Sequence, residues 1–380
     1  MRSTSLEQAQ RRLEVLLGAA ESPLPPLPPA GSEMVVYGAG NCGREVLALL
    51  QSQGYHIAGF LDARGTTLGK VGGIECATPD SEPARRWAAR GLPVALAVFN
   101  YATDIGAIAN RLQQIGFQRI ISYYELFERF PKPSSRFWLA PRRFYREHAK
   151  ALMDCLALWS DETSRQIFLE SLELRLTFNL QLLRQPDQDR QYFPRDLPPL
   201  KQPIRFVDGG AFVGDTLQNL VQNGFTFSAV AAFEPDLENF RRLCEFVGAH
   251  RQTLGDAILF PCGLGSETGQ FRFEAGMGEG SLLHESGNSS VQVVRMDDVL
   301  PTFAPTLIKL DVEGAEPAAL RGAQETIVRY GPDVAVCLYH AARHLWELPL
   351  LLHQLRPDYS LALRYHQFNG LEVVAYAFRR

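Results

Sequence analysis

Two glycine-rich turns constrain the fold of this 380-residue chain more than any other feature. The first, at Gly38–Gly43, follows the apolar run Val35–Tyr37 and precedes a helical pattern. The second, at Gly209–Gly214, follows the apolar run Ile204–Val207 in the same way. A strand, a tight glycine turn and a helix form the first unit of an open parallel sheet that binds nucleotide-like ligands. Two such units predict two doubly wound, Rossmann-like α/β domains.

The apolar runs after the second turn indicate a seven-stranded sheet. Its predicted strands are 204–207, 229–233, 257–261, 306–310, 333–339, 360–365 and 372–378. Between the last two, Phe368-Asn-Gly370 has the composition of a two-residue hairpin turn. Five parallel strands closed by an antiparallel hairpin are typical of a class I methyltransferase sheet. A dinucleotide dehydrogenase would add a parallel sixth strand instead.

Changes in pattern divide the chain into four segments. Residues 1–30 combine a helical periodicity with a proline-rich linker, and residues 31–131 alternate short strands and helices as a first Rossmann-like domain. Residues 132–200 carry long helical periodicities, which predict a helical connector. Residues 201–380 form the second α/β domain. The predicted fold class is α/β, with two doubly wound domains joined by the connector.

Composition excludes several classes of protein. A formal net charge of -4 without a basic stripe argues against a nucleic-acid partner. The first residues lack the apolar core of a signal peptide, and no apolar run is long enough to span a bilayer. The six cysteines are scattered, which is typical of free thiols in a reducing compartment. These features predict a cytoplasmic protein and leave its oligomeric state open.

The second glycine turn predicts a cofactor site. Gly209, Gly210 and Gly214 allow the backbone to approach a ligand closely and open a helix near Asp215. Asp208 stands at the end of the preceding strand, where its carboxylate would repel a pyrophosphate. The amino group and the sulfonium of S-adenosylmethionine carry the opposite charge, so this cofactor fits the pattern better than a dinucleotide does.

Later strand ends extend the predicted cofactor site. Glu234 ends the second strand, where a carboxylate can accept hydrogen bonds from both ribose hydroxyls of an adenosine. Its alternative role is to cap the helix that begins at Pro235. Gly263 follows the third strand, where the adenine edge would meet the backbone. The predicted cofactor ligands are Asp208, Gly209, Gly210, Gly214, Asp215, Glu234, Gly263 and Asp311.

The ends of strands four to six carry the candidate catalytic residues. Lys309 and Asp311 share one face of strand four, Glu313 follows them, and the three are predicted to position the acceptor and the sulfonium. His340 ends strand five and is predicted to be the general base that takes the proton from an acceptor hydroxyl. His366, at the end of strand six, is the alternative base.

No metal ion is predicted at this site. The alternative is a Mg²⁺ ion held by Asp298, Asp311 and Glu313, because a divalent cation can lower the pKa of a bound hydroxyl. A pair formed by His340 and His344 is a further alternative, weakened because His340 is expected at the end of a strand and not on a helix.

The second domain resembles the FkbM-type methyltransferases. The resemblance covers roughly residues 190–380 and rests on motifs spread over the domain. They are Tyr192-Phe-Pro194, Phe206–Ala211, Phe233-Glu-Pro235, Met296-Asp-Asp298, Ile308–Glu316 and Tyr339-His340. It implies an S-adenosylmethionine-dependent O-methyltransferase that acts on a hydroxyl of a sugar, a glycan or a secondary metabolite. The acceptor would thus be a small molecule or a glycan.

The first glycine turn permits several interpretations. Gly38, Gly40 and Gly43 precede a helix, and Asp62 ends the next strand, where it could bind the ribose of NAD. The stretch 59–74 is also similar to the nucleotide-sugar-binding domain of bacterial sugar acyltransferases, which would imply a nucleotide-sugar ligand. A purely structural fold is the third possibility. For the whole chain, the alternative to an enzyme is a nucleotide-sugar-binding or scaffold protein with a non-catalytic methyltransferase-like domain.

Overall fold

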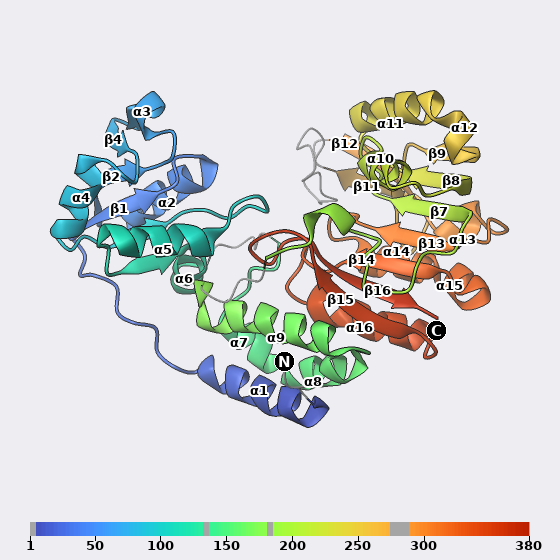
Figure 1. Cartoon of the computed structure of the whole chain (residues 1–380), viewed down its shortest axis with the longest axis horizontal. Helices are drawn as coiled ribbons and strands as arrows, with labels where there is room; N and C mark the ends of the chain where they lie inside the picture. The colour runs from blue at the N-terminus through green and yellow to red at the C-terminus, as the bar shows by residue number, and fades with distance from the viewer. Residues whose placement is uncertain (1–4, 132–136, 181–184, 274–288, 380) are drawn as a thin grey trace.

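A computed structural model describes residues 5–131, 137–180, 185–273 and 289–379. Two sheet-containing domains lie side by side, and a group of helices lies below and between them (Figure 1). Both domains are mixed α/β layers, as the sequence predicts. In the described part of the chain, no helix has the length and apolarity needed to cross a membrane.

The N-terminal domain is a six-stranded sheet in the order β3-β4-β2-β1-β5-β6. Its strands pair in parallel except for the β3–β4 hairpin, which the sequence did not predict. The strands are β1 (Glu33–Tyr37), β2 (His56–Leu61), β3 (Lys70–Val71), β4 (Ile74–Ala77), β5 (Val94–Leu96) and β6 (Ile120–Ser122). Its helices are α2 (Asn41–Ser52), α3 (Gly65–Leu68), α4 (Glu82–Ala89), α5 (Ile105–Ile115) and α6 (Tyr123–Arg129).

The connector consists of α7 (Arg142–Glu147), α8 (Ala149–Leu158) and α9 (Glu162–Thr177). Helix α1 (Leu6–Ala19) packs on α8 and α9, although the first domain follows it in the sequence. Its apolar side chains belong to the same buried cluster as the C-terminal sheet. The proline-rich segment then runs as an extended strap from α1 to β1 (Figure 1).

The C-terminal domain contains a seven-stranded sheet in the order β15-β16-β14-β13-β7-β8-β9. Strands β9, β8, β7, β13 and β14 are parallel, and β16 inserts antiparallel between β14 and β15. This is the predicted arrangement of five parallel strands closed by an antiparallel pair. The bounds are β7 (Ile204–Gly209), β8 (Phe227–Phe233), β9 (Asp256–Phe260), β13 (Leu307–Leu310), β14 (Asp333–Cys337), β15 (Ser360–Tyr365) and β16 (Val373–Phe378).

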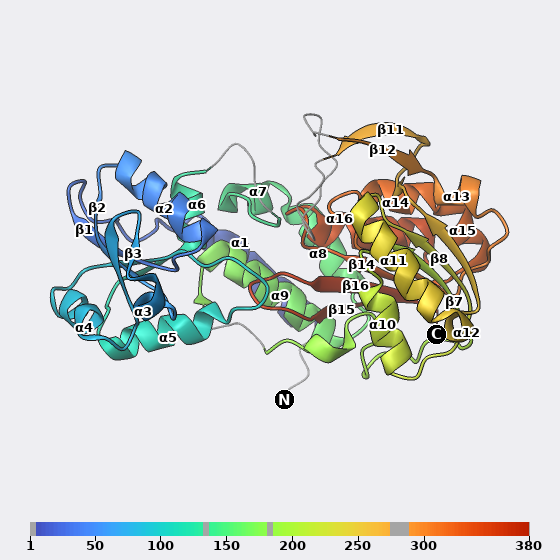
Figure 2. The same ribbon diagram turned by 90° about the horizontal axis from the view of Figure 1, so that it is seen from above.

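Helices cover both faces of this sheet, so its central strands are apolar on both sides. One face packs against α13 (Met296–Val299), α14 (Glu316–Gly322), α15 (Gln324–Tyr330), α16 (His344–Leu355) and the connector helices. The other packs against α10 (Asp215–Gln222), α11 (Leu237–Ala249), α12 (Arg251–Leu254) and the segment around Tyr192. Figure 2 shows these layers from above.

Two details differ from the sequence-based prediction. A separate three-stranded sheet, formed by β10 (Gly263–Leu264), β11 (Gly269–Phe273) and β12 (Ser289–Val294), was not expected. The predicted two-residue hairpin turn was wrong, because seven residues, 366–372, separate β15 from β16. Asn369 and Gly370 do adopt the positive φ values of such a turn. The turn sits inside a longer loop because Asn369 is buried against the N-terminal domain.

Candidate functional site

A cleft of about 270 Å³ lies at the carboxyl ends of the parallel strands of the C-terminal sheet. Ligands of open α/β sheets bind at this edge. Seven predicted site residues line it, namely Gly210, Asp215, Glu234, Gly263, Lys309, Asp311 and Glu313. Residues that the sequence did not single out as ligands line it too, among them Tyr101, Gln191, Tyr192, Tyr339, Gln367 and Glu372. Asp208, Gly209, Gly214 and His340 are not part of its lining.

The glycine turn after β7 is held between the two neighbouring strand ends. The backbone N–H groups of Gly210 and Ala211 donate to the carbonyl oxygen of Phe233 at 3.0 and 2.9 Å. Gly210 has a φ of 75°, and a Cβ at this position would lie 1.8 Å from the carbonyl oxygen of Asp311. A side chain is therefore excluded at Gly210 both by the backbone conformation and by packing.

Glu234 is buried at the end of β8, and its carboxylate is fixed by two backbone donors. Its Oε2 accepts from the N–H of Phe212 at 2.9 Å, and its Oε1 accepts from the N–H of Asp236 at 2.8 Å. Each oxygen keeps further acceptor capacity, and the residue lines the cleft. Burial raises the pKa of Glu234 to about 7 despite these hydrogen bonds. A pair of ribose hydroxyls could donate to the lone pairs of this carboxylate that the two backbone N–H groups leave free.

Asp208 and Lys309 form a buried ion pair beneath the cleft. The two residues are cross-strand partners on β7 and β13, and Nζ of Lys309 lies 3.1 Å from Oδ1 of Asp208. The ammonium also donates to the carbonyl oxygen of Gly210 at 2.6 Å. Burial raises the pKa of Asp208 to about 6, although the charge of Lys309 opposes that shift. Asp208 is not part of the cleft lining, and both of its carboxylate oxygens lack a hydrogen-bond partner among the described residues. A direct contact between Asp208 and a ligand stays a prediction.

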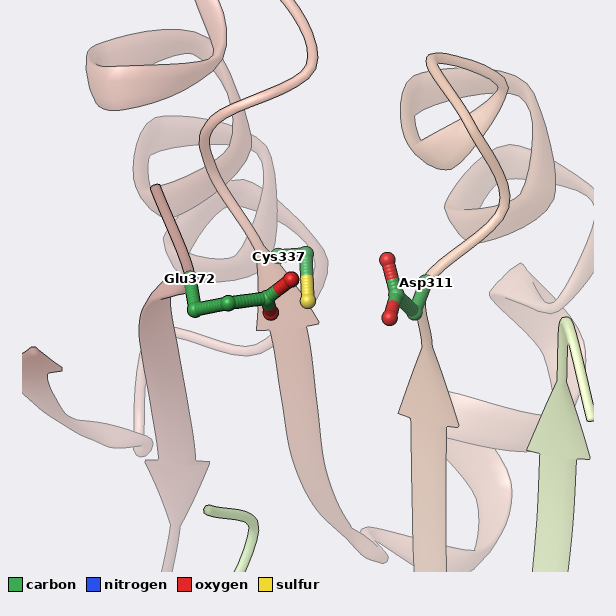
Figure 3. Close-up of side chains that lie close together, drawn as sticks. All are labelled: Asp311, Cys337 and Glu372. Carbon is green, nitrogen blue, oxygen red and sulfur yellow. The ribbon is translucent and has the colours of Figure 1, made fainter. Parts of the chain in front are cut away.

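Carboxylates from two chain segments, the loop after β13 and the loop before β16, gather at this edge of the sheet. Asp311 accepts hydrogen bonds from the hydroxyls of Tyr192 and Tyr339 at 3.1 and 3.3 Å. Glu372 accepts from Nε2 of Gln191 at 2.6 Å. Figure 3 shows Asp311 and Glu372 at the ends of two strands that are separated by the strand ending in Cys337, whose thiol lies between the two carboxylates.

Glu313 completes this acidic group from the loop after β13. It has a φ of 55°, a strained conformation for a residue with a side chain. Its Oε2 is buried without a hydrogen-bond partner among the described residues and lies 3.3 Å from Nε2 of His340. Burial raises the pKa of Glu313 to about 8, although the nearby His340 opposes the shift.

The prediction that His340 is a general base at the end of a strand is not supported by its surroundings. β14 ends at Cys337, and the buried imidazole lies behind the acidic group, with Nδ1 2.8 Å from Oε1 of Glu316. Burial alone would lower the pKa of His340, but the Glu316 carboxylate outweighs it and raises the pKa to about 10. A protonated imidazole has no lone pair with which to take a proton.

The alternative base, His366, is also buried and fully engaged. One ring nitrogen lies 2.7 Å from the carbonyl oxygen of Asp187, and the other lies 2.7 Å from the hydroxyl of Tyr376. Its neighbour Gln367 lines the cleft, whereas His366 does not. Its position thus indicates a structural role in fixing the loop before β16.

The side chains that lie close enough to share a metal ion differ from the sets considered from the sequence. Asp298 interacts with Thr268 and Arg295 next to α13, so it does not join Asp311 and Glu313. Among the described residues, the sets with ligand atoms close enough to share an ion are Asp311 with Cys337 and Glu372, and Asp311 with Glu316 and His340. Neither set includes His344, whose Nδ1 instead lies 3.3 Å from Glu316.

In the N-terminal domain, the predicted nucleotide-binding residues interact mainly with one another and with their own sheet. Oδ2 of Asp62 accepts from the N–H of Ala39, and Oδ1 accepts from the backbone and the guanidinium of Arg64. A Cβ at Gly43 would lie 1.9 Å from the carbonyl oxygen of Gly38, so this glycine is required by packing. Gly40 precedes α2 and has open space around it. The purely structural interpretation accounts for these contacts.

Comparison with known proteins identifies the C-terminal domain. Residues 208–356 match the methyltransferase FkbM domain. The matched segment contains the glycine turn, Glu234, Asp311 and His340, so it spans most of the cleft. The match supports a methyltransferase function for this domain. No curated protein matches the chain in sequence.

A solved structure shares the fold of both domains. Methyltransferase FkbM from Methylobacillus flagellatus KT superposes with a TM-score of 0.79 at 20% identity. The match covers 98% of this chain and 100% of the other, so it includes the N-terminal domain as well as the FkbM domain. Neither comparison supports the expected resemblance to sugar acyltransferases, or a nucleotide-sugar or NAD site in the N-terminal domain.

Proposed function

We propose that this protein is an S-adenosylmethionine-dependent O-methyltransferase whose acceptor is a hydroxyl of a sugar, a glycan or a secondary metabolite. The observation that carries the proposal is the buried carboxylate of Glu234. It is oriented by two backbone donors beside a glycine turn and faces the cleft. The match of residues 208–356 to the FkbM domain supports the same reaction class.

The cofactor fits the half of the cleft that lies over β7, β8 and β9. Glu234 would accept the ribose hydroxyls, and Gly263, which has no side chain and lines the cleft, would lie against the adenine. The acidic residues over β13 would face the sulfonium and amino group, whose positive charges they complement. When bound, S-adenosylmethionine supplies the electrophilic methyl group.

The chain's own residues supply orientation and a proton acceptor. Most of the acceleration in such a displacement comes from holding the acceptor oxygen in line with the methyl carbon. We assign the general base to Glu313, because it lines the cleft and its Oε2 has no hydrogen-bond partner among the described residues. A carboxylate with a pKa near the working pH suits this task. His340 then acts as a positioning residue that holds Asp311 and Glu313.

Titration calorimetry with S-adenosylhomocysteine tests the cofactor site. The wild-type protein should bind, and Glu234→Ala should bind at least about tenfold more weakly, because it loses charge-assisted hydrogen bonds worth roughly 1.5–3 kcal/mol each. Transfer of label from methyl-labelled S-adenosylmethionine to a cell extract tests the reaction. Binding without any transfer would favour the alternative, a scaffold with a non-catalytic methyltransferase-like domain.

A ligand of the N-terminal domain forms no part of this function. A nucleotide-sugar or NAD would compete for Asp62 with the guanidinium of Arg64, which donates to both carboxylate oxygens. The surroundings of Asp62 favour a structural role for the first glycine turn.

A further inference from the structure

The cleft is lined from the strand ends of β8 and β9 on one side to the loop before β16 on the other. Glu234 follows β8 and Glu372 precedes β16, and four strand spacings separate these two strands in the sheet. At about 4.8 Å per spacing, the backbones of these two strands stand about 19 Å apart across the sheet. Asp311, after β13, lies between them. The end of the cleft over β14 and β16 is therefore the place for the methyl acceptor.

The wall at this acceptor end includes a residue of the other domain. Tyr101 lies in the loop between β5 and α5 of the N-terminal domain, and it lines the same cleft as Gln367 and Glu372. Figures 1 and 2 both show this loop beside the loop that joins β15 to β16. The acceptor site thus lies at the junction of the two domains.

Hydrogen bonds across the junction fix the position of Tyr101. The N–H of Phe368 donates to the carbonyl oxygen of Tyr101 at 3.0 Å. The side-chain amide of Asn369 donates to the carbonyl oxygens of Asn100 and Thr103 at 2.5 and 2.9 Å. The indole N–H of Trp138 in turn donates to the carbonyl oxygen of Asn369 at 3.0 Å. The backbone on both sides of Tyr101 is held by these hydrogen bonds, whereas its side chain makes none with the residues that the structure describes.

The chemistry of this end of the cleft combines one aromatic ring with many hydrogen-bonding groups. Tyr101 is 46% exposed as a residue and lines the cleft, so it is accessible to a ligand. The carboxylates of Glu313 and Glu372 and the amides of Gln191 and Gln367 line the same cleft. Aromatic faces favour the apolar face of a ring, and the carboxylates accept hydrogen bonds from hydroxyl groups.

We propose that Tyr101 is an acceptor-binding residue and that the acceptor is a polyhydroxylated ring, such as a glycosyl unit, whose face stacks on it. This inference rests on the proposed methyltransferase function and narrows its substrate class. It also gives the N-terminal domain a task that requires no ligand of its own. The first domain holds one wall of the acceptor site, and the FkbM domain holds the cofactor.

Saturation-transfer difference NMR on the full chain tests this proposal. The protein is loaded with S-adenosylhomocysteine and mixed with millimolar methyl glycosides of glucose, galactose, mannose, rhamnose and fucose. Catechol, measured separately, represents the alternative class of acceptor, a planar aromatic compound with hydroxyl groups. The variants are Tyr101→Ala, Tyr101→Phe and, as a matched control, Phe271→Ala. Phe271 is another exposed aromatic residue, located on β11 and not part of the cleft lining.

At least one glycoside should give signals with the wild type, Tyr101→Phe and Phe271→Ala. Tyr101→Ala should bind it about tenfold more weakly, as expected for the loss of a stacking contact. The affinity for S-adenosylhomocysteine should be the same in all four proteins. Unchanged glycoside binding by Tyr101→Ala, or signals from catechol alone, would overturn the proposal. If the wild type does not bind S-adenosylhomocysteine at all, the proposed function itself is rejected.

Discussion

Glu316 holds His340 from below the acidic group of the cleft: Nδ1 of the imidazole lies 2.8 Å from Oε1 of the carboxylate, and both side chains are buried. The same carboxylate accepts a hydrogen bond from the N–H of Val312 at 2.9 Å, which ties the loop after β13 to α14. The other imidazole nitrogen faces Asp311 and Glu313 at 3.5 and 3.3 Å. His340 thus carries a positive charge among three carboxylates.

This pairing predicts how stability depends on pH. The pKa of Glu316 is lowered to about 2, because the charges of His340 and His344 and the hydrogen bond from Val312 outweigh its burial, and the pKa of His340 is raised to about 10. Stability from a lowered carboxyl pKa is present above about pH 4.5, and stability from a raised histidine pKa is present below about pH 6.5. The contribution of the Glu316–His340 pair to the free energy of unfolding is therefore largest between about pH 4.5 and pH 6.5, and it is lost as the pH rises toward about 10 and His340 loses its proton.

His340→Gln should weaken this dependence of stability on alkaline pH. The variant leaves Glu316 buried without its main counter-charge, which costs about 3–5 kcal/mol. Urea unfolding of the wild type should show a decrease in the free energy of unfolding between about pH 6.5 and pH 9.5, and His340→Gln should be less stable and show a smaller decrease. A variant with the wild-type slope would show that another group titrates in this range.

Glu234 provides a second pH-dependent prediction, in which the protonated form favours folding and the charged form favours cofactor binding. Burial raises the pKa of Glu234 to about 7, so the charged form that accepts the ribose hydroxyls is costly in the folded protein. Stability associated with the protonated group is complete below about pH 4.5 and is lost as the pH rises through about 7. Glu234→Gln should therefore be more stable than the wild type at about pH 8.

The same variant should bind the cofactor less well. Glu234→Gln keeps the shape of the side chain but replaces an acceptor oxygen with a donor, so the affinity for S-adenosylhomocysteine should fall by about tenfold or more. In the wild type, that affinity should increase between about pH 6 and pH 8, and in the variant it should not. Calorimetric titration at several pH values measures both effects. A wild-type affinity that is flat with pH would mean that Glu234 is charged throughout.

The central part of the site could be predicted because its residues stand at strand ends that the sequence reveals. Asp208, Glu234 and Asp311 each end an apolar run, and the carboxyl ends of parallel strands must meet at one edge of the sheet. The pairing of Asp208 with Lys309 was missed because it depends on register. The two residues are opposite each other on β7 and β13, and the sequence pattern does not specify which residues of two strands are partners.

The residues from outside these strand ends could not be predicted. Tyr101 reaches the cleft from a loop of the other domain, and Gln191 reaches it from the connector. No periodicity relates either residue to the sheet. The surroundings of His340 could not be predicted, because its protonation depends on Glu316, at the start of a helix after another strand. The Tyr339-His340 motif located this histidine but did not reveal the buried carboxylate below it.

Two glycines of the cleft should respond differently to the same added methyl group. At Gly210 a Cβ would lie 1.8 Å from the carbonyl oxygen of Asp311, and the φ of 75° adds strain, so Gly210→Ala should disrupt the turn and lower the unfolding temperature. At Gly263 the nearest atom would be Cγ2 of Val293 at 3.5 Å, an ordinary contact.

Gly263→Ala should therefore fold with wild-type stability and bind S-adenosylhomocysteine about tenfold more weakly, because its methyl group occupies space in the cleft. Thermal unfolding and calorimetric titration of both variants provide the comparison. If Gly263→Ala binds as tightly as the wild type, the adenine does not contact this position. If Gly210→Ala is as stable as the wild type, the turn must be able to shift away from Asp311.

Asn369 should control the rigidity of the domain junction without affecting cofactor binding. Its side chain is fully buried and donates to the carbonyl oxygens of Asn100 and Thr103, while its backbone has a φ of 66°. Asn369→Gly removes both hydrogen bonds and keeps the positive φ without strain, so it isolates the loss of the two bonds. Each is worth roughly 0.5–1.5 kcal/mol, and the two carbonyl groups lose their partner.

Hydrogen exchange at the amide of Phe368, which donates to Tyr101 across the same junction, reports on this change. Exchange should be faster in Asn369→Gly by about tenfold or more, because the opening of the junction becomes easier. Asn369→Asp should be worse still, since a carboxylate would face two carbonyl oxygens that it cannot donate to. The affinity for S-adenosylhomocysteine should stay within about twofold of wild type in Asn369→Gly, because Glu234 and the glycine turn lie at the other end of the cleft. Wild-type exchange in Asn369→Gly would show that Trp138 and the backbone contacts alone hold the two domains together, and Tyr101 would then be positioned independently of Asn369.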